Sequence, residues 1–287
     1  MEIGVTFPQT EIGADPVAVR DYAQAAEALG FTHLLVYDHV LGAQPGEHRP
    51  GWRGPYDWRS NFHEPFVLFG YLAGLTKTIE FVTGILVLPQ RQTALVAKQA
   101  AAVSVLAGGR LRLGVGNGWN ATEFEALNED FHNRGRRIEE QIEVMRLLWT
   151  RDVVTFEGRW HRINHMAIYP RPERPLPVWL GGMSEAAMRR AARIADGWFP
   201  MFRPGGPDPR ETIDRWWSYV REYGRDPKDA GLQTSVNMTG DPDEWRARLE
   251  LFRGLGVDYV CVNTMGTGLA GPRDHIDAIR RYKEAIA

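Results

Sequence analysis

The fold is decided by residues 81–119, which read FVTGILVLPQRQTALVAKQAAAVSVLAGGRLRLGVGNGW. The two ends of this stretch are apolar and β-branched, as strands are, whereas Thr93 to Leu106 has a helical pattern and is rich in alanine. Such small side chains allow a helix to pack closely against a wall of strands. The order strand, helix, strand therefore predicts parallel strands joined by a helical crossover.

The same alternation runs along the whole chain of 287 residues. We expect the strands at Ile3-Phe7, His33-Tyr37, Phe81-Leu86, Leu111-Val115, Val178-Leu180, Gly197-Phe199, Leu232-Val236 and Tyr259-Val262. The first helix should begin at Asp15-Pro16 and end at Gly30, because these residue types are typical of helix boundaries. An open, doubly wound sheet also fits the alternation. The number of units favours a single (β/α)8 TIM barrel domain over residues 1–287, because closure gives the first strand a partner.

Two connections are too long to be simple turns. Val40 to His63, after the second strand, is rich in Gly, Pro and aromatic residues, among them Trp52. We expect this insertion at the mouth of the barrel, where loops build active sites, although its aromatic side chains could equally form a small satellite core. Arg151 to Pro177, before the fifth strand, predicts an extra β-hairpin and a rigid proline-rich connection.

The composition argues against several classes of function. The formal net charge is −2, so we expect a small-molecule substrate and neither a nucleic-acid nor a membrane partner. A single cysteine, Cys261, excludes an internal disulfide framework and suits a reducing cytosol. The N-terminus has no signal-peptide pattern and no segment is apolar enough to span a membrane, which predicts a cytoplasmic protein. His161 and His165 lie in the expected hairpin, so no metal site is predicted there.

Two motifs lie at the ends of the second and third predicted strands. Asp38 and His39 place a carboxylate beside an imidazole, an arrangement found both in hydrogen-bonded structural histidines and in catalytic sites. Gly84 interrupts a β-branched run, which indicates a bulge or the close approach of another group to the backbone. Both motifs lie where a barrel of this kind builds its active site.

The fourth predicted strand ends in glycines. Gly114, Gly116 and Gly118 alternate with other residues, and Asn117 and Trp119 flank the last of them. The spacing fails as a dinucleotide-binding fingerprint, because the third glycine is misplaced. The glycines nevertheless indicate that a planar or anionic group can approach the main chain here.

A Gly-Gly turn, Gly181-Gly182-Met183-Ser184, follows the fifth predicted strand. Serine is a common N-cap, and the free N–H groups at the start of a helix bind anions. The turn is therefore a candidate phosphate site, although an ordinary serine-capped helix gives the same pattern. A Walker A loop and a G-x-S-x-G elbow are absent. A hydrolase is disfavoured, because the predicted strand ends carry no pair of carboxylates.

Taken together, these segments resemble the luciferase-like monooxygenase superfamily, in particular its coenzyme F420-dependent branch. The resemblance covers nearly the whole chain. It rests on IGVTFPQ, on AAEALGFTHLLVYDHV, on the block from Thr83 to Leu127 that contains GVGNGW, and on LPVWLGGMSEAAMRRAARIADGW. It implies a barrel of the bacterial-luciferase type, with insertions after strand 2 and before strand 5, and by analogy a homodimer.

The resemblance also implies an activity. We expect an oxidoreductase that transfers a hydride between F420 and a small organic substrate. A reduced-FMN-dependent monooxygenase is the alternative, and a non-catalytic barrel that has lost its coenzyme is a further one. Relatives that oxidise sugar phosphates carry a tryptophan and a glutamate at places that hold residues near Ala43 and Trp119 in this chain. Oxidation of a sugar phosphate is therefore not expected.

Finally, the resemblance implies roles for the motifs at the strand ends. Gly84-Ile85 is expected to be a non-prolyl cis peptide beneath the coenzyme ring. Asp38 and His39 would lie near the ring, with His39 as the catalytic proton donor or acceptor. The other coenzyme contacts implied are Asn117, Gly118 and Trp119 for the ring and its side chain, and Gly181, Gly182, Met183 and Ser184 for the phosphate.

Overall fold

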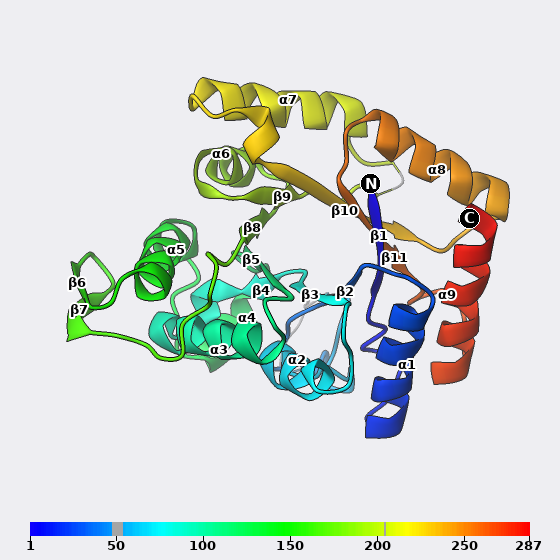
Figure 1. Ribbon diagram of the computed structural model, residues 1–287, viewed down its shortest axis with the longest axis horizontal. Coiled ribbons are helices and arrows are strands. Elements are labelled where there is room, and N and C mark those ends of the chain that lie inside the picture. Colours follow the sequence, from blue (N-terminus) through cyan, green and yellow to red (C-terminus); the bar gives the residue numbers. More distant parts are fainter. Residues whose placement is uncertain (48–53, 204) are drawn as a thin grey trace.

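The computed structural model describes residues 1–47, 54–203 and 205–287, so Trp52 lies outside the described residues. Parallel strands close into a barrel in the order β3-β2-β1-β11-β10-β9-β8-β5, and β5 pairs with β3 (Figure 1). The strands are β1 (Glu2–Thr6), β2 (His33–Val36), β3 (Glu80–Thr83), β5 (Leu111–Gly116), β8 (Val178–Gly181), β9 (Gly197–Phe199), β10 (Gly231–Asn237) and β11 (Tyr259–Asn263). The predicted barrel is confirmed, and each of its eight strands overlaps its predicted range.

The third barrel strand differs from its prediction as one continuous strand. It is split into β3 and β4 (Leu86–Val87), and β4 pairs with β5 rather than continuing the ladder to β2. The peptide bond between Gly84 and Ile85, in the interruption, is cis, as the resemblance implied. Gly84 has no room for a side chain, because a Cβ there would lie 2.4 Å from Leu35 Cγ.

Helices cover the outside of the barrel. They are α1 (Pro16–Ala28), α2 (Pro65–Ala73), α3 (Thr93–Leu106), α4 (Ala121–Ala126), α5 (Arg134–Thr150), α6 (Glu185–Ile194), α7 (Pro209–Glu222), α8 (Pro242–Gly254) and α9 (Pro272–Ile286), with 3-10 turns η1 (Leu88–Gln90) and η2 (Pro227–Asp229). The predicted start of α1 is confirmed, because Asp15 accepts a hydrogen bond from Val17 N at 2.9 Å. Gly30, with φ +73°, follows its end. α3 has the bounds predicted from its alanine-rich sequence.

The connection before β8 contains the predicted hairpin, β6 (Val154–Glu157) and β7 (Arg162–Met166), which projects from the barrel in Figure 1. Glu140 of α5 holds the hairpin tip, because its carboxylate accepts hydrogen bonds from the backbone N–H groups of Arg159, Trp160 and His161. Within the described residues, no group of His, Cys, Asp and Glu side chains could hold a metal ion. His161 Nδ1 also lies 2.8 Å from Glu140 Oε1, which gives His161 a structural role in this hairpin.

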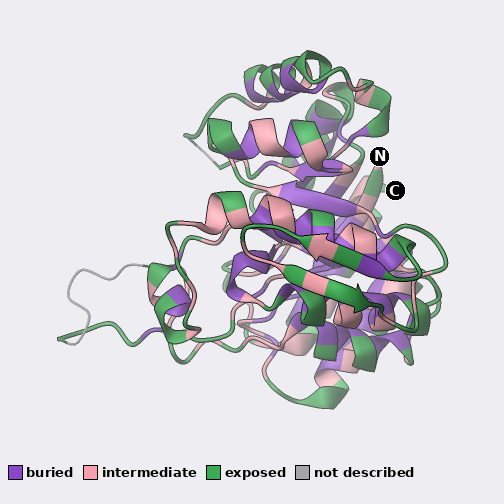
Figure 2. Ribbon diagram, turned by 90° about the vertical axis from the view of Figure 1, so that its left-hand side faces the viewer, coloured by how far each residue is buried: buried purple, intermediate pink, exposed green. Residues whose placement is uncertain are grey.

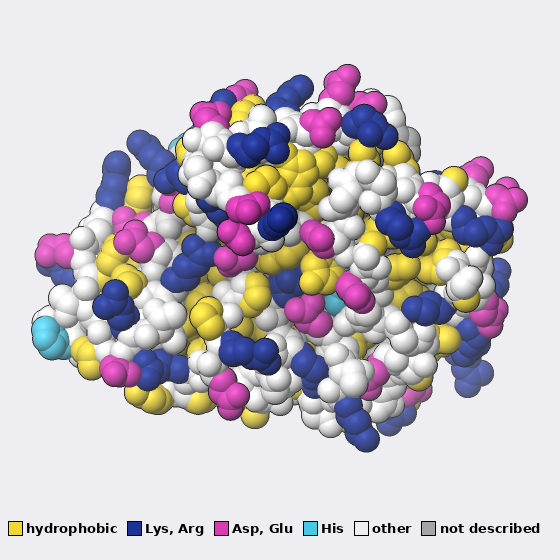
Figure 3. All heavy atoms as spheres, turned by 45° about the horizontal axis from the view of Figure 1, so that its top comes forward, with side chains coloured by type: hydrophobic (Ala, Val, Ile, Leu, Met, Phe, Trp, Pro, Cys, Tyr) yellow, Lys and Arg dark blue, Asp and Glu magenta, His cyan; other side chains and the backbone are white. Residues whose placement is uncertain are grey.

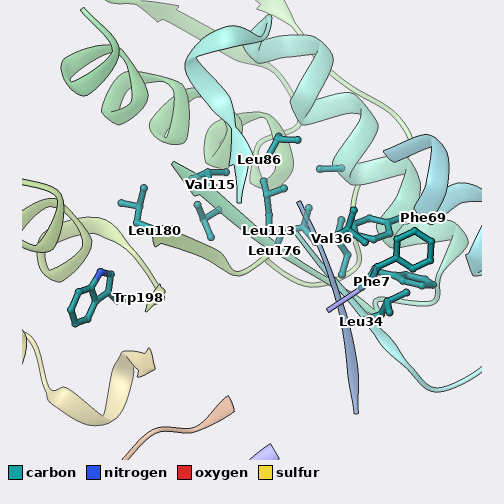
Figure 4. Packing of buried hydrophobic residues seen from close by; sticks show 14 of the residues in the cluster. Phe7, Leu34, Val36, Phe69, Leu86, Leu113, Val115, Leu176, Leu180 and Trp198 are labelled. Carbon is teal, nitrogen blue, oxygen red and sulfur yellow. The ribbon is translucent and has the colours of Figure 1, made fainter. Parts of the chain in front are cut away.

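The core has two layers. Leu34 and Val36 of β2 point toward the helices, where Figure 4 shows Leu34 close to Phe7 and Phe69. Leu35, which lies between them on the strand, points into the barrel and packs with Val82 and Cys261, as the alternation of side chains along a strand requires. Figure 2 shows the same division at the level of ribbons, with buried strands and helices that are exposed on their outer faces.

The surface mixes charges of both signs. On the face shown in Figure 3, hydrophobic side chains gather near the middle, and Lys, Arg, Asp and Glu are interspersed around them. None of the helices in the described ranges 1–47, 54–203 and 205–287 has the length and apolar character of a membrane span.

Candidate active site at the mouth of the barrel

Asp38, which follows β2, is a buried anchor. Its Oδ1 atom accepts a hydrogen bond from Arg91 Nη2 at 2.7 Å, and its Oδ2 atom accepts one from Val87 N at 2.9 Å. Arg91 also donates to Glu64 Oε1 at 2.8 Å, at the start of α2. A buried carboxylate needs such partners, and here they tie the end of β2 to the segment after β4. Asp38 therefore fixes the backbone beside the site, and both of its oxygens are already used.

His39, the next residue, faces a cavity. Its Nδ1 atom lies 3.1 Å from Glu123 Oε2 on α4, while Glu123 Oε1 accepts hydrogen bonds from Val40 N at 2.6 Å and Leu41 N at 3.1 Å. Burial alone would raise the pKa of Glu123, but the hydrogen bonds from His39 and these two backbone groups hold this pKa below its usual value. Glu123 is thus an ionised, fully engaged carboxylate behind the imidazole.

Glu123 is not among the site residues predicted from the sequence. The residue is 84 positions from His39 in the chain, so no local spacing connects the two. The available signal was an acidic residue in the short helical segment directly after the glycine-rich end of the fourth strand. Only the closure of the barrel brings this segment beside the end of β2.

The cavity beside His39 has a volume of about 320 Å³. Its lining comes from the insertion after β2 and from the loop after β5, namely His39, Val40, Leu41, Gly42, Ala43, Tyr56, Asp57, Trp58, Ser60, Phe62, Trp119 and Asn120. The ring centroids of Tyr56, Phe62 and Trp119 lie 4.7, 4.9 and 6.0 Å from that of His39. The described aromatic residues of the insertion therefore form a pocket wall at the mouth, as expected of an active-site loop.

The glycines after β5 leave room for neighbouring parts of the chain. A Cβ on Gly116 would lie 2.6 Å from Ile85 Cδ1, and a Cβ on Gly118 would lie 2.5 Å from Val87 Cγ1. A Cβ on Gly114 would lie 2.0 Å from the backbone oxygen of Thr83. The third strand therefore fills the space that a side chain would need at each of these positions, which is a reason for glycine that involves no ligand. Contact between this main chain and a coenzyme stays a prediction.

Ile85 connects three of the predicted motifs. Besides the approach to Gly116, its Cγ2 atom would lie 2.9 Å from a Cβ on Gly181 at the end of β8. Ile85 and Gly84 are themselves partly exposed. The Gly84-Ile85 segment therefore forms part of the floor of the mouth, between the ends of β5 and β8.

The turn after β8 has the geometry of a capped helix start. Ser184 Oγ accepts a hydrogen bond from Ala187 N at 3.3 Å, which makes Ser184 the N-cap of α6 as predicted. Gly182 has φ +126°, and its carbonyl accepts a hydrogen bond from Trp198 Nε1 at 2.9 Å. Met183 accepts one from Met201 N through its sulfur at 3.2 Å. The contacts from Trp198 and Met201 fix the turn, and its N–H groups lie at the positive end of the α6 dipole.

Asn117 lies between β5 and the start of α5. A Cβ on Gly135 would lie 3.8 Å from Asn117 Nδ2 and 3.3 Å from Nη2 of Arg190, a residue of α6. Asn117 Oδ1 is buried and makes no hydrogen bond among the described residues. A buried amide oxygen without a partner is costly, so this position fits a ligand or a water that donates a hydrogen bond.

The sequence matches the model of a known family. The family model described as luciferase-like monooxygenase matches residues 1–285. The chain belongs to this family. The resemblance inferred from the strand-end motifs is thus confirmed.

Relatives in this family differ in their coenzyme. An uncharacterised protein of Mycobacterium tuberculosis is 39% identical over 69% of this chain and 68% of its own length. An F420-dependent glucose-6-phosphate dehydrogenase of Intrasporangium calvum is 32% identical over 74% of this chain and 67% of its own length. An FMNH(2)-dependent dimethylsulfone monooxygenase of Pseudomonas fluorescens is 32% identical over 63% and 46%. The relatives support an oxidoreductase and leave both coenzymes open.

Solved structures agree with the fold. The monooxygenase RslO1 from Streptomyces bottropensis superposes with a TM-score of 0.80 at 20% identity, and the alignment covers 100% of this chain and 98% of RslO1. An F420-dependent secondary alcohol dehydrogenase in complex with an F420-acetone adduct superposes with a TM-score of 0.78 at 19% identity, over 100% and 99%. At these identities, the likeness shows the (β/α)8 barrel fold alone.

Proposed function

We propose that this luciferase-like protein is an F420-dependent oxidoreductase that transfers a hydride between F420 and a small organic substrate. One observation carries the proposal: an imidazole backed by a buried carboxylate faces an aromatic-lined cavity at the mouth of the barrel. A residue that handles protons beside an aromatic-lined cavity is what a hydride-transfer site requires of its protein.

The coenzyme would be held by the motifs at the strand ends. Gly84 and Ile85 would support the ring system, and Asn117, Gly118 and Trp119 would contact its edge and its side chain. The segment 181–184 would bind the phosphate through the N–H groups at the start of α6. The unpartnered Asn117 Oδ1 fits this assignment, because it offers an acceptor to a hydroxyl-bearing side chain. When bound, F420 would supply the hydride chemistry.

The protein's own residues would then have three tasks. His39 would hold or accept a proton at Nε2, next to the reacting atoms. Asp38, through Arg91 and Val87, would position the backbone that carries His39. The aromatic side chains around the cavity would exclude water and orient the substrate.

A reduced-FMN-dependent monooxygenase is the second candidate. The observation in its favour is the FMNH(2)-dependent relative from Pseudomonas fluorescens, which is as similar in identity as the F420-dependent one from Intrasporangium calvum. Both coenzymes present a tricyclic ring, a polyol chain and a phosphate, so the same three motifs serve either. Oxidation of a sugar phosphate is not proposed, because the resemblance implies a glutamate in such enzymes at a place that falls near Trp119 in this chain.

Titration of the purified protein with F420 and, separately, with FMN tests the proposal through coenzyme fluorescence. Micromolar binding of F420 without binding of FMN supports it. Binding of FMN alone overturns it in favour of the monooxygenase. Binding of neither coenzyme, in its oxidised or reduced form, overturns both and favours a barrel that has lost its coenzyme.

A further inference from the structure

Glu123 divides its two carboxylate oxygens between the imidazole and the loop. Oε2 faces Nδ1 of His39, and Oε1 binds the backbone N–H groups of Val40 and Leu41, the first residues of the insertion after β2. We infer that Glu123 is a positioning residue, which fixes His39 in the tautomer with the proton on Nδ1, so that the lone pair of Nε2 faces the cavity.

The chemistry of the carboxylate carries this inference. The Glu123 side chain is 1% exposed, so water cannot replace either of its contacts. An ionised carboxylate only accepts hydrogen bonds, and a neutral imidazole carries one N–H. The contact between Glu123 and Nδ1 therefore requires the proton on Nδ1. Hydrogen bonds to an ionised group are about twice as strong as neutral ones, which makes the preference for this tautomer large.

The other ring nitrogen is left for a ligand. Among the residues that the structure describes, Nε2 of His39 has no hydrogen-bond partner, and it is not enclosed by the protein. Edge-on contacts with Tyr56 and Phe62 enclose the sides of the ring. With a neutral ring, the cavity therefore presents a hydrogen-bond acceptor, which selects substrates that offer an O–H or N–H group. This last step rests on the proposed function.

A second histidine and glutamate pair shows what a purely structural arrangement looks like. His161 Nδ1 lies 2.8 Å from Glu140 Oε1, and Glu140 also accepts hydrogen bonds from backbone N–H groups. Nε2 of His161, however, lies 2.6 Å from Thr93 Oγ1, so both of its nitrogens are used within the fold. His39 is also paired with a glutamate through Nδ1, namely Glu123, but its second nitrogen is left for the cavity.

Nitrogen-15 NMR of histidine-labelled protein without coenzyme tests the inference, at a pH where the histidine signals no longer move. The His39→Ala variant identifies the His39 signals. In the wild type, we expect Nδ1 protonated over Nε2 by at least about tenfold, because a charge-assisted hydrogen bond decides the tautomer. Protonation of Nε2 in the wild type, or an even mixture, overturns the inference without any variant.

The Glu123→Gln variant provides a second arm. The amide oxygen keeps the bonds from Val40 N and Leu41 N, so the amide NH2 faces Nδ1 and donates to it. We expect the proton to move to Nε2, which reverses the tautomer ratio. Glu125→Gln, the same change at an exposed residue of α4, should leave the ratio unchanged. An unchanged ratio in a folded Glu123→Gln protein contradicts the inference.

The test separates this inference from the proposed function. The tautomer is measured without coenzyme, whereas the function is tested by coenzyme fluorescence. The expected tautomer in a protein that binds neither coenzyme supports the inference and overturns the function. The opposite tautomer in a protein that binds F420 overturns the inference and leaves the function supported.

Discussion

His33 and His39 belong to the same strand and the loop that follows it, yet they lie at opposite ends of the barrel and differ in every contact. His33, at the amino end of β2, is fully buried, and its ring fills the space that a side chain on Gly4 would need. Burial, reinforced by the charge of Arg112, holds the pKa of His33 well below its ordinary value. His39, at the carboxyl end, has a carboxylate partner and a cavity.

The difference shows that the position on the barrel decides what a polar residue does. At the amino end, Arg112 is also buried, lies 2.8 Å from Glu80 Oε2 and covers the Tyr259 ring at 3.8 Å from its centroid. Charged groups there are part of the packing. At the carboxyl end, the same residue types are arranged around a space that a ligand can enter, as is general for this fold.

The largest effect should come from His39. His39→Ala should lower turnover with F420 by about 10²–10⁴, the usual contribution of a positioned acid or base, because the cavity loses its proton-handling group. F420 affinity should change little, because the phosphate turn and the ring support are untouched. Steady-state kinetics and the fluorescence titration measure the two quantities. Unchanged turnover would remove the role assigned to His39, and His132→Ala, at an exposed position, is the control.

The largest effect on stability should come from Arg91. Arg91→Met leaves the buried Asp38 carboxylate without its cation, which should lower the free energy of unfolding by about 3–5 kcal/mol. Urea unfolding measures this, with Arg280→Met as the control, because the Arg280 pair with Asp277 is exposed and worth about 1 kcal/mol or less. A loss no larger than the control's would show that Asp38 is not the anchor described above.

The packing role of His33 can be tested from its neighbour. A Cβ on Gly4 would lie 2.3 Å from the His33 carbonyl oxygen and 2.5 Å from its ring, so Gly4→Ala should lower the free energy of unfolding by about 1–3 kcal/mol. Gly70→Ala in α2, where nothing lies within 4 Å, should instead be neutral or gain up to about 1 kcal/mol. Equal effects of the two substitutions would refute this view of the amino end.

The smallest effect is a pH dependence. Because the folded-state pKa of His33 is depressed, the unfolded chain binds a proton that the folded chain does not, once the pH falls below about 6.5. Stability should therefore fall below that pH by about 1.4 kcal/mol per pH unit from this residue. His33→Gln should remove that part of the slope, while His275, whose pKa burial also lowers, leaves a remainder. Denaturant unfolding at several pH values measures the slope of the unfolding free energy for the wild type and for His33→Gln. Equal slopes in the two proteins would contradict this prediction.

Local sequence features predicted most of the fold but only part of the site. The strands, the Asp15 cap and the bounds of α3 follow from runs of adjacent residues, which is why they could be predicted. The partners of His39 and Asp38 lie 84 and 53 residues away, at Glu123 and Arg91, and no local pattern specifies such pairs. The glycines after β5 mark missing side chains in the sequence, but only the structure shows that residues of the third strand fill their place.

The central claim is that F420 binds at the mouth beside His39. Nitrogen-15 NMR of the histidine side chains during an F420 titration tests it most directly. The His39 signals should shift and saturate with the fluorescence change, while the His33 signals at the amino end stay in place. Saturable F420 binding that leaves the His39 signals unmoved, or that moves those of His33 instead, would contradict the account.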